Sequence, residues 1–186
     1  MLPDLERRSV VELRGELAPR PRIVGHAVIF DTRSQDLGGF VEVVRASAVD
    51  RSLTGDVRCL YNHDPGAVLG RTPTTLTLTK ETRGLAFELD PAQTQAGRDA
   101  FELVRRGDIR GASFGFRTLK DAWQRDGRVV IRELLDVEIL EISLTAFPSY
   151  QQTDVSVAQR ALQAANLSAR GQVPSIHWLR MQARVR

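Results

Sequence analysis

The sequence predicts a mainly β fold of the α+β class, built as a small barrel or sandwich. Several mostly apolar runs have the length of single strands, and signals for tight turns separate them. Only one long helix with clear end signals interrupts the series. Short strands that are joined by tight turns, with few helices, are typical of barrels and sandwiches.

The first strands are predicted from apolar and β-branched composition. Ile23 to Phe30 is a mostly apolar run of strand length, and Phe40 to Val44 is short and rich in valine. Val57 to Tyr61 leads into the polar segment Asn62 to Gly66. Runs of this kind favour strands, and the polar segment favours a loop.

The later strands are predicted from alternation and from turn residues. Thr75 to Thr79 alternates with period two, and Leu85 to Leu89 repeats the pattern after a turn at Gly84, so the two segments are expected to form a hairpin. Asp126-Gly127 is a turn signal between two further strands. Val137 to Ala146 is expected to close the series.

One helix is predicted from the residues at its two ends. Thr94 is placed as an N-cap, Gln95 to Arg106 carries the helical apolar positions, and Gly107 stands where a left-handed residue ends a helix. A second, short helix is predicted over Ser47 to Leu53.

The length of 186 residues fits one domain with tails. The charged residues 1–21, which contain two prolines near their end, are expected to form a flexible arm. Residues 22–158 hold nearly all of the apolar pattern and are expected to be the folded body. Residues 159–186 are expected to be a basic tail, helical at first and then broken at Gly171 and Pro174.

Composition excludes several classes of protein. The sequence has no apolar run of membrane-spanning length and no secretory signal pattern at its N-terminus, so no membrane partner is expected. Its single cysteine, Cys59, excludes a disulfide framework and a cysteine-rich zinc site. All but two of the 26 basic residues are arginine, and the pI is about 9.6. This surplus indicates either nucleic-acid contact or a genome of high GC content.

Two residues stand out as candidates for chemistry. His63 follows a predicted strand beside Pro65, and its near-neutral pKa range suits proton transfer, although a surface-loop histidine would look the same. The other histidines, His26 and His177, fall in an apolar strand and in the tail. Ser113 has a glycine two residues to either side, which allows another segment to approach closely, although a serine in a turn or bulge would also fit.

Two carboxylates fall within the last predicted strand. Glu141 and Glu138 each need a partner or an exposed face, because burying an unpaired carboxylate is costly. Strict alternation would place Glu141 on the face of Ile139 and Ser143, and Glu138 on the opposite face. Glu141 could therefore orient a histidine, or form a structural ion pair with an arginine.

Five segments in order resemble one family. They are Tyr-Asn-His-Asp-Pro, Leu-Gly-Arg-Thr, Gly-Leu-Ala-Phe-Glu, Arg-Gly-Asp-Ile-Arg-Gly-Ala-Ser-Phe-Gly-Phe and Glu-Ile-Ser-Leu-Thr-Ala-Phe-Pro-Ser-Tyr. Together they look like the prohead proteases of tailed bacteriophages, over about residues 22–160. The family's fold is similar to that of the herpesvirus assembly protease, so the resemblance implies a closed antiparallel β-barrel with surrounding helices.

The resemblance also implies a function and a site. Ser113 matches the family nucleophile, His63 its base, and Glu141 the acidic position, with Glu138 left as an alternative. Donors to the oxyanion are expected among the backbone near Gly111, Ala112 and Phe114, or from a water held by Arg71 or Arg132. No metal and no cofactor is expected.

The implied substrates are the scaffold segment of the major capsid protein precursor and the protease itself, inside the procapsid in the cytoplasm of a bacterial host. The chain could come from a phage or a prophage, could form a homo-oligomer, and would not require nucleic acid. Two alternatives remain open. One is a non-catalytic capsid-assembly or scaffold-binding factor on the same fold, and the other is cysteine chemistry at Cys59.

Overall fold

The structure is a computed structural model that describes residues 5–10, 13–16 and 20–146. Its twelve elements follow one another along the chain as the sequence alternates between strand-forming runs and turns. They are β1 (Glu6–Val10), β2 (Leu13–Glu16), β3 (Arg22–Ile29), β4 (Val41–Val44), the 3₁₀ helix η1 (Ala46–Thr54), β5 (Arg58–Tyr61), β6 (Asp64–Arg71), β7 (Leu76–Lys80), β8 (Gly84–Leu89), α1 (Gln95–Arg106), β9 (Gly111–Asp126) and β10 (Val129–Thr145).

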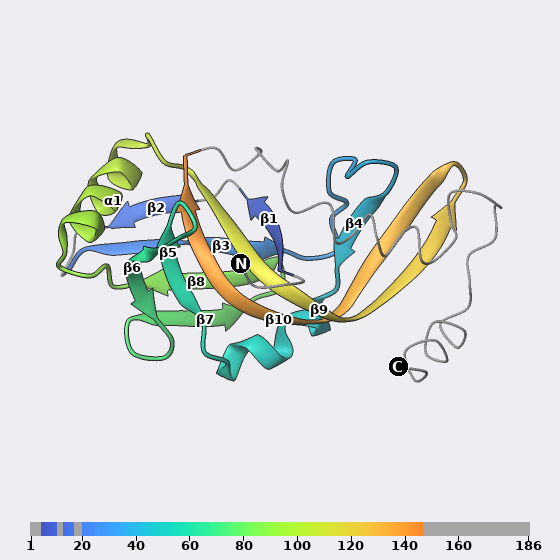
Figure 1. The fold of residues 1–186 in the computed structure, drawn as a ribbon, viewed down its shortest axis with the longest axis horizontal. Coiled ribbons are helices and arrows are strands. Elements are labelled where there is room, and N and C mark those ends of the chain that lie inside the picture. The colour runs from blue at the N-terminus through green and yellow to red at the C-terminus, as the bar shows by residue number, and fades with distance from the viewer. Residues whose placement is uncertain (1–4, 11–12, 17–19, 147–186) are drawn as a thin grey trace.

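The strands form two sheets, as Figure 1 shows. One has the order β1-β9-β10-β5-β6, with β4 also paired to β10, and the other has the order β2-β3-β8-β7. The predicted mainly β fold of the α+β class is confirmed. The predicted closed barrel is not, because the strand pairs of residues 5–146 that the structure describes form two separate sheets rather than one continuous ring.

Both sheets contribute apolar side chains to one core. Phe114 and Phe116 of β9 stack with their ring centroids 5.0 Å apart, and Ile142 of β10 is fully buried beside them in the same cluster. Ile23 and Leu85 enter this cluster from the four-stranded sheet. Removing these side chains from water is the main contribution that fixes the two sheets against each other.

The structure confirms the elements that were predicted from capping residues, turn residues and alternation. Helix α1 begins after Thr94, whose side chain accepts a hydrogen bond from the Gly97 amide at 3.2 Å, and it ends at Gly107 with φ 81°. The short helix near Ser47 is present as η1. Strands β7 and β8 form the predicted antiparallel hairpin, and Gly127 lies at the turn between β9 and β10.

The N-terminal segment differs from the prediction. Residues 1–21 were expected to be a flexible arm, but β1 pairs with β9 and β2 pairs with β3. The reason lies in charge rather than in apolar pattern. Glu6 and Arg8 of β1 are buried with Glu42 and Arg132, and the Arg132 guanidinium donates to Glu6 at 2.6 Å. A strand that is fixed by distant ions carries no apolar periodicity of its own.

Arg132 is the centre of this buried ionic cluster. It is 2% exposed and pairs with Glu6, Glu42 and Asp121, at 2.6, 3.1 and 2.7 Å. Burial opposes the ionisation of Glu6, but the charge of Arg132 and its hydrogen bond outweigh burial and hold the pKa of Glu6 below its ordinary value. The cluster therefore holds Glu6 in its charged form at neutral pH.

Replacing Arg132 by methionine is expected to lower the free energy of unfolding by about 3–5 kcal/mol, because three carboxylates lose their shared cation in a buried setting. Urea denaturation monitored by circular dichroism would measure the change. The matched control is Arg117→Met, since Arg117 pairs with Glu138 at 3.1 Å with both side chains about 40% exposed, and its loss should lower that free energy by less than about 1 kcal/mol. Equal losses for the two variants would contradict the assigned role of the cluster.

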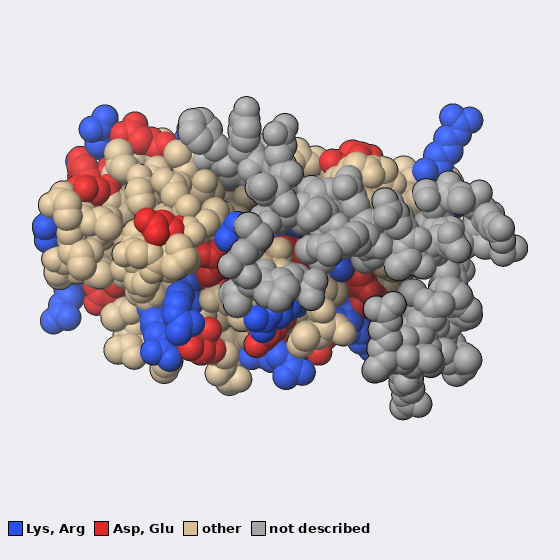
Figure 2. Space-filling model, in the orientation of Figure 1, with Lys and Arg blue, Asp and Glu red and all other residues tan. Residues whose placement is uncertain are grey.

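Basic and acidic side chains are interspersed over the described part of the face in Figure 2. No helix in the described part of the chain is long and apolar enough to cross a bilayer. The predicted tail over residues 159–186 lies outside the described residues, as does the end of the predicted body after residue 146.

Candidate active site

Three segments of the larger sheet end at the same place. Strand β5 runs parallel to β10, so the C-terminal ends of both strands meet at one end of the sheet. Strand β9 runs antiparallel to β10, so its first residues lie at that end too. This topology brings together Ser113 near the start of β9, Glu141 and Ser143 near the end of β10, and the turn after β5.

His63 is positioned by a two-residue hairpin turn. Tyr61 pairs with Asp64, and the two residues between them, Asn62 and His63, have φ values of 49° and 60°. Two successive left-handed residues make a type I′ turn, which matches the twist of the strands on either side. The backbone N–H of Asn62 donates to the Leu144 carbonyl at 3.0 Å, which holds the turn against β10. The predicted loop is therefore shorter and more tightly fixed than expected.

The turn brings His63 to Glu141. The Nδ1 atom of His63 lies 2.7 Å from Oε1 of Glu141, although the two residues are 78 positions apart in the sequence. Glu141 is 7% exposed. Gly115 makes room for it, because a Cβ atom at Gly115 would lie 2.7 Å from Cγ of Glu141. The close approach predicted from the glycines around Ser113 is therefore made by a carboxylate.

A β-bulge turns Glu141 toward this face. Ile139 pairs with Phe116 while Glu141 pairs with Gly115, so Leu140 is an extra residue in β10. Phe116 and Gly115 lie on opposite faces of β9, and a bulge changes which face the following residues occupy. The prediction that Glu141 shares a face with Ile139 is therefore wrong, although the shared face with Ser143 is right.

Glu138 lies on the same face of the sheet as Glu141, contrary to the prediction of opposite faces. Its cross-strand partner is Arg117, which alternates with Gly115 along β9. The Arg117 guanidinium donates to Glu138 at 3.1 Å. Glu138 is thus engaged in an ion pair further along the hairpin, whereas Glu141 contacts the histidine.

Ser113 lies on the same face of the sheet as Glu141. Its cross-strand partner in β10 is Ser143, and opposite residues in neighbouring strands share a face. Ser143 donates a hydrogen bond from Oγ to Oε2 of Glu141 at 3.2 Å. Ser113 itself is 2% exposed. A hydroxyl, an imidazole and a carboxylate therefore lie at one end of one sheet, which is the set of groups that acyl transfer by a serine requires.

The carboxylate of Glu141 is held in its charged form. Burial opposes its ionisation, but the hydrogen bond and the charge of His63, with those of Arg7, hold the pKa of Glu141 below its ordinary value. An ionised carboxylate at Nδ1 fixes the ring so that Nε2 is the nitrogen left to exchange a proton with a nucleophile.

Arg7 is a residue of this site that the sequence did not reveal. Its Nε donates to Oε1 of Glu141 at 3.0 Å, so one carboxylate oxygen accepts from both Arg7 and His63. Arg7 lies in β1 within the predicted arm, where no apolar pattern or motif distinguishes it from the neighbouring charged residues. The pairing of β1 with β9 places Arg7 opposite Gly115 and so brings it to Glu141.

The other predicted residues fall into two groups. Gly111, Ala112 and Phe114 lie in β9 beside Ser113, where β10 pairs with this whole segment. The two arginines that were considered as holders of a water lie elsewhere. Arg132 is committed to the buried ionic cluster, and Arg71 is 60% exposed and paired with Asp56 at 2.6 Å. Arg132 is excluded by its three carboxylate partners, and the exposed Arg71 is engaged by Asp56 rather than by Ser113, His63 or Glu141.

Cys59 does not fit the alternative of cysteine chemistry. It is fully buried in β5, and burial together with the negative charge of Glu141 raises the pKa of its thiol far above the ordinary value. We expect iodoacetamide to alkylate Cys59 at least about 100-fold more slowly in the native protein than in urea, because reaction requires opening of the core. Mass spectrometry of timed samples would measure both rates. Comparable rates would contradict burial of the thiol.

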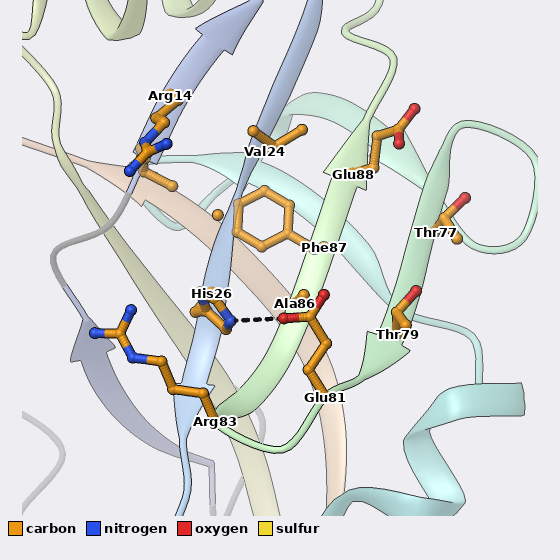
Figure 3. Close-up of a pocket in the computed structure, with 12 residues that line it drawn as sticks. Arg14, Val24, His26, Thr77, Thr79, Glu81, Arg83, Ala86, Phe87 and Glu88 are labelled. Atoms are coloured by element: carbon orange, nitrogen blue, oxygen red, sulfur yellow. Dashed lines mark hydrogen bonds and ion pairs between the residues drawn. The ribbon is translucent and has the colours of Figure 1, made fainter.

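His26 lies in the other sheet, away from these residues. It projects from β3 into an open pocket of about 600 Å³, where its Nε2 lies 3.2 Å from Oε2 of Glu81, as Figure 3 shows. Arg14, Arg83 and Glu88 line the same pocket. In the described ranges, no group of three or more histidine, cysteine or acidic side chains is arranged to hold a metal ion.

Comparisons with known proteins point to one family. A model of the caudovirus prohead serine protease family matches residues 9–168. Among solved structures, the chain is similar to the capsid assembly protease of bacteriophage T4, with 10% sequence identity and a TM-score of 0.42. That likeness covers 75% of this chain and 99% of the phage T4 chain. A search of curated proteins found no match.

Proposed function

The chain belongs to the caudovirus prohead serine protease family, and we propose that it is a serine endopeptidase that cleaves the scaffold segment of a capsid protein precursor, and itself, during procapsid maturation. The observation that carries this proposal is the 2.7 Å contact between His63 Nδ1 and Glu141 Oε1, on the sheet face to which Ser113 belongs. The family membership supplies the class of substrate. The proposed setting is the unfilled procapsid in the cytoplasm of a bacterial host.

The proposed reaction follows the usual roles of these groups. Nε2 of His63 accepts the proton of the Ser113 hydroxyl as its oxygen attacks a peptide carbonyl, which forms a tetrahedral oxyanion. His63 then donates that proton to the leaving amine, and the acyl-serine ester forms. Water attacks the ester by the same route, with His63 as the base, and regenerates Ser113. Glu141 holds the imidazole in place and stabilises the imidazolium between these transfers.

The oxyanion requires hydrogen-bond donors near Ser113. The proposed donors are backbone N–H groups of β9 around Ala112 and Phe114, which can bind an oxyanion only when the strand paired beside them has moved away. One such donor typically lowers the barrier by about 3 kcal/mol. Arg132 is withdrawn as a candidate because it belongs to the ionic cluster. No cofactor takes part in the proposed reaction.

The test is co-expression with the capsid protein precursor from the same genome, followed by mass measurement of both chains. We expect the precursor to lose a terminal segment, and we expect a fluorophosphonate to stop this loss by forming one adduct on Ser113. Intact precursor together with an unlabelled Ser113 would refute the protease and favour the non-catalytic assembly factor. An adduct on a different serine would refute the assigned nucleophile.

A further inference from the structure

The first strand of the fold lies directly on the strand of the nucleophile. Residues Glu6–Val10 of β1 pair antiparallel with Ala112–Phe116 of β9, and Ser9 stands opposite Ser113. Strand β10 pairs with the same part of β9 on its other side. Both edges of β9 are therefore occupied around the nucleophile, and an extended peptide that binds by adding a strand to β9 needs the edge that β1 holds.

We propose that this edge of β9 binds an extended polypeptide by strand addition, and that β1 is an intramolecular occupant that must leave before the polypeptide is cut. This inference rests on the proposed function and deepens it. It names the form in which a substrate is bound, an extended strand, and it makes β1 the regulator of the site.

The contacts of β1 are mostly ionic, which makes its departure feasible. Its side chains toward the core include the buried Glu6 and Arg8, and Arg8 pairs with Glu42 at 2.8 Å. Val10 is the only apolar residue of the strand. Glu6 and Arg8 would leave together, and Arg132 keeps Glu42 and Asp121 as partners, so no buried charge is left unpaired. Detaching β1 therefore exposes little apolar surface of the strand itself.

The position of β1 also allows it to detach without breaking another strand pair. Among the described strands it pairs only with β9. A groove of about 740 Å³ lies beside it, lined by Ser9, Val10, Phe30, Arg33 and Phe114 among others. Along the chain, β2 follows β1 and belongs to the other sheet, so β2 can remain in place.

Arg7 connects the occupancy of this edge to the chemistry. Arg7 donates to the same Glu141 oxygen that contacts His63, so a cation of β1 neutralises part of the negative charge that faces the imidazole. Arg7 therefore competes with the imidazole for the same carboxylate oxygen. Departure of β1 would remove this cation and open the edge of β9 in one movement.

A strand-exchange measurement tests the proposal. The protein carries Ser9→Pro and Val10→Pro. Successive N–H groups of a strand point to opposite sides, so one of these two N–H groups points toward β9, and proline at both positions removes that hydrogen bond. Ser113→Ala is added to prevent cleavage. The probe is a fluorescent peptide with the sequence of residues 4–12, and its affinity is measured by fluorescence anisotropy. We expect the peptide to bind the proline variant at least about ten-fold more tightly than it binds the protein that carries Ser113→Ala alone, because the competing strand is weakened.

Controls make each outcome decisive. Equal affinity for the two proteins, or equal affinity for a peptide of scrambled order, would overturn the proposal. If the proline variant fails to fold, hydrogen exchange on the unmodified protein decides, since β1 amides should exchange at least about ten-fold faster than those of β10. Equal protection of both strands would overturn it. The binding assay uses inactive variants, so strand exchange in that assay, together with an intact capsid precursor in the co-expression test of the unmodified protein, would refute the proposed function alone.

Discussion

Replacing Ser113 by alanine is expected to lower kcat for peptide-bond cleavage by about 10⁶-fold, because the oxygen that we propose attacks the carbonyl is lost. The fold should survive, since alanine is smaller than serine and Ser113 makes no hydrogen bond that holds the described strands together beyond its backbone pairs with β1 and β10. The rate is measured as release of the processed capsid precursor, and the fold as the thermal unfolding midpoint.

Ser143→Ala is the matched control for this variant. Ser143 is the cross-strand neighbour of Ser113 and is equally buried, but its hydroxyl donates a hydrogen bond to Glu141. We expect its loss to lower kcat by about 10- to 100-fold at most, the cost of one hydrogen bond to a charged group. If Ser143→Ala is as inactive as Ser113→Ala, the assignment of the nucleophile to Ser113 is wrong.

Replacing Glu141 by glutamine is expected to lower kcat by about 10³- to 10⁴-fold, with a much smaller change in KM. Glu141 accepts hydrogen bonds from His63, Arg7 and Ser143. A neutral amide has one oxygen for these three donors, and it neither stabilises the imidazolium nor fixes the ring tautomer. Because the pKa of Glu141 lies below its ordinary value, the carboxylate is ionised at neutral pH and the full effect should appear there.

Glu138→Gln separates this role from a general loss of negative charge. Glu138 lies on the same face of β10 but pairs with Arg117, and its side chain is 41% exposed. Its kcat should stay within about two-fold of the parent, because an exposed ion pair contributes little even to stability. An effect as large as that of Glu141→Gln would assign the acidic role to Glu138.

The parts of the fold that could be predicted from the sequence depend on short-range signals. The ends of α1 follow from Thr94 and Gly107, whose side chain and backbone act within one helical turn. The hairpin of β7 and β8 follows from period-two alternation and a glycine at its turn. In each case, the residues that determine the element lie within it or directly beside it.

The parts that could not be predicted depend on partners far away in the sequence. β1 looks like a solvated arm because Glu6 and Arg8 are charged, and only Arg132 and Glu42 make their burial favourable. The same limit hid Arg7 from the candidate site. Closure of a barrel is also a long-range property, and strand patterns alone do not distinguish one ring from two sheets.

Two kinds of sequence evidence predicted the residues of the candidate site: resemblance to a family and the alternation of residues along a strand. The resemblance to a family named Ser113, His63 and Glu141, and the structure brings His63 and Glu141 into contact on the face of Ser113. Reasoning from strand parity also favoured Glu141 over Glu138, but for a reason that the structure replaces. Alternation assumed an unbroken strand, while β10 contains Leu140 as an additional residue.

This additional residue affects the shape of β10 rather than the face that its acid occupies. Deleting Leu140 would leave Ile139 opposite Phe116 and Glu141 opposite Gly115, so the Glu141 carboxylate would stay on the face of Ser113. The deletion would instead remove the local bend and the extra twist that a bulge gives to a strand. A family member that lacks this residue would therefore keep its acid in register and differ in the curvature of the hairpin beside the candidate site.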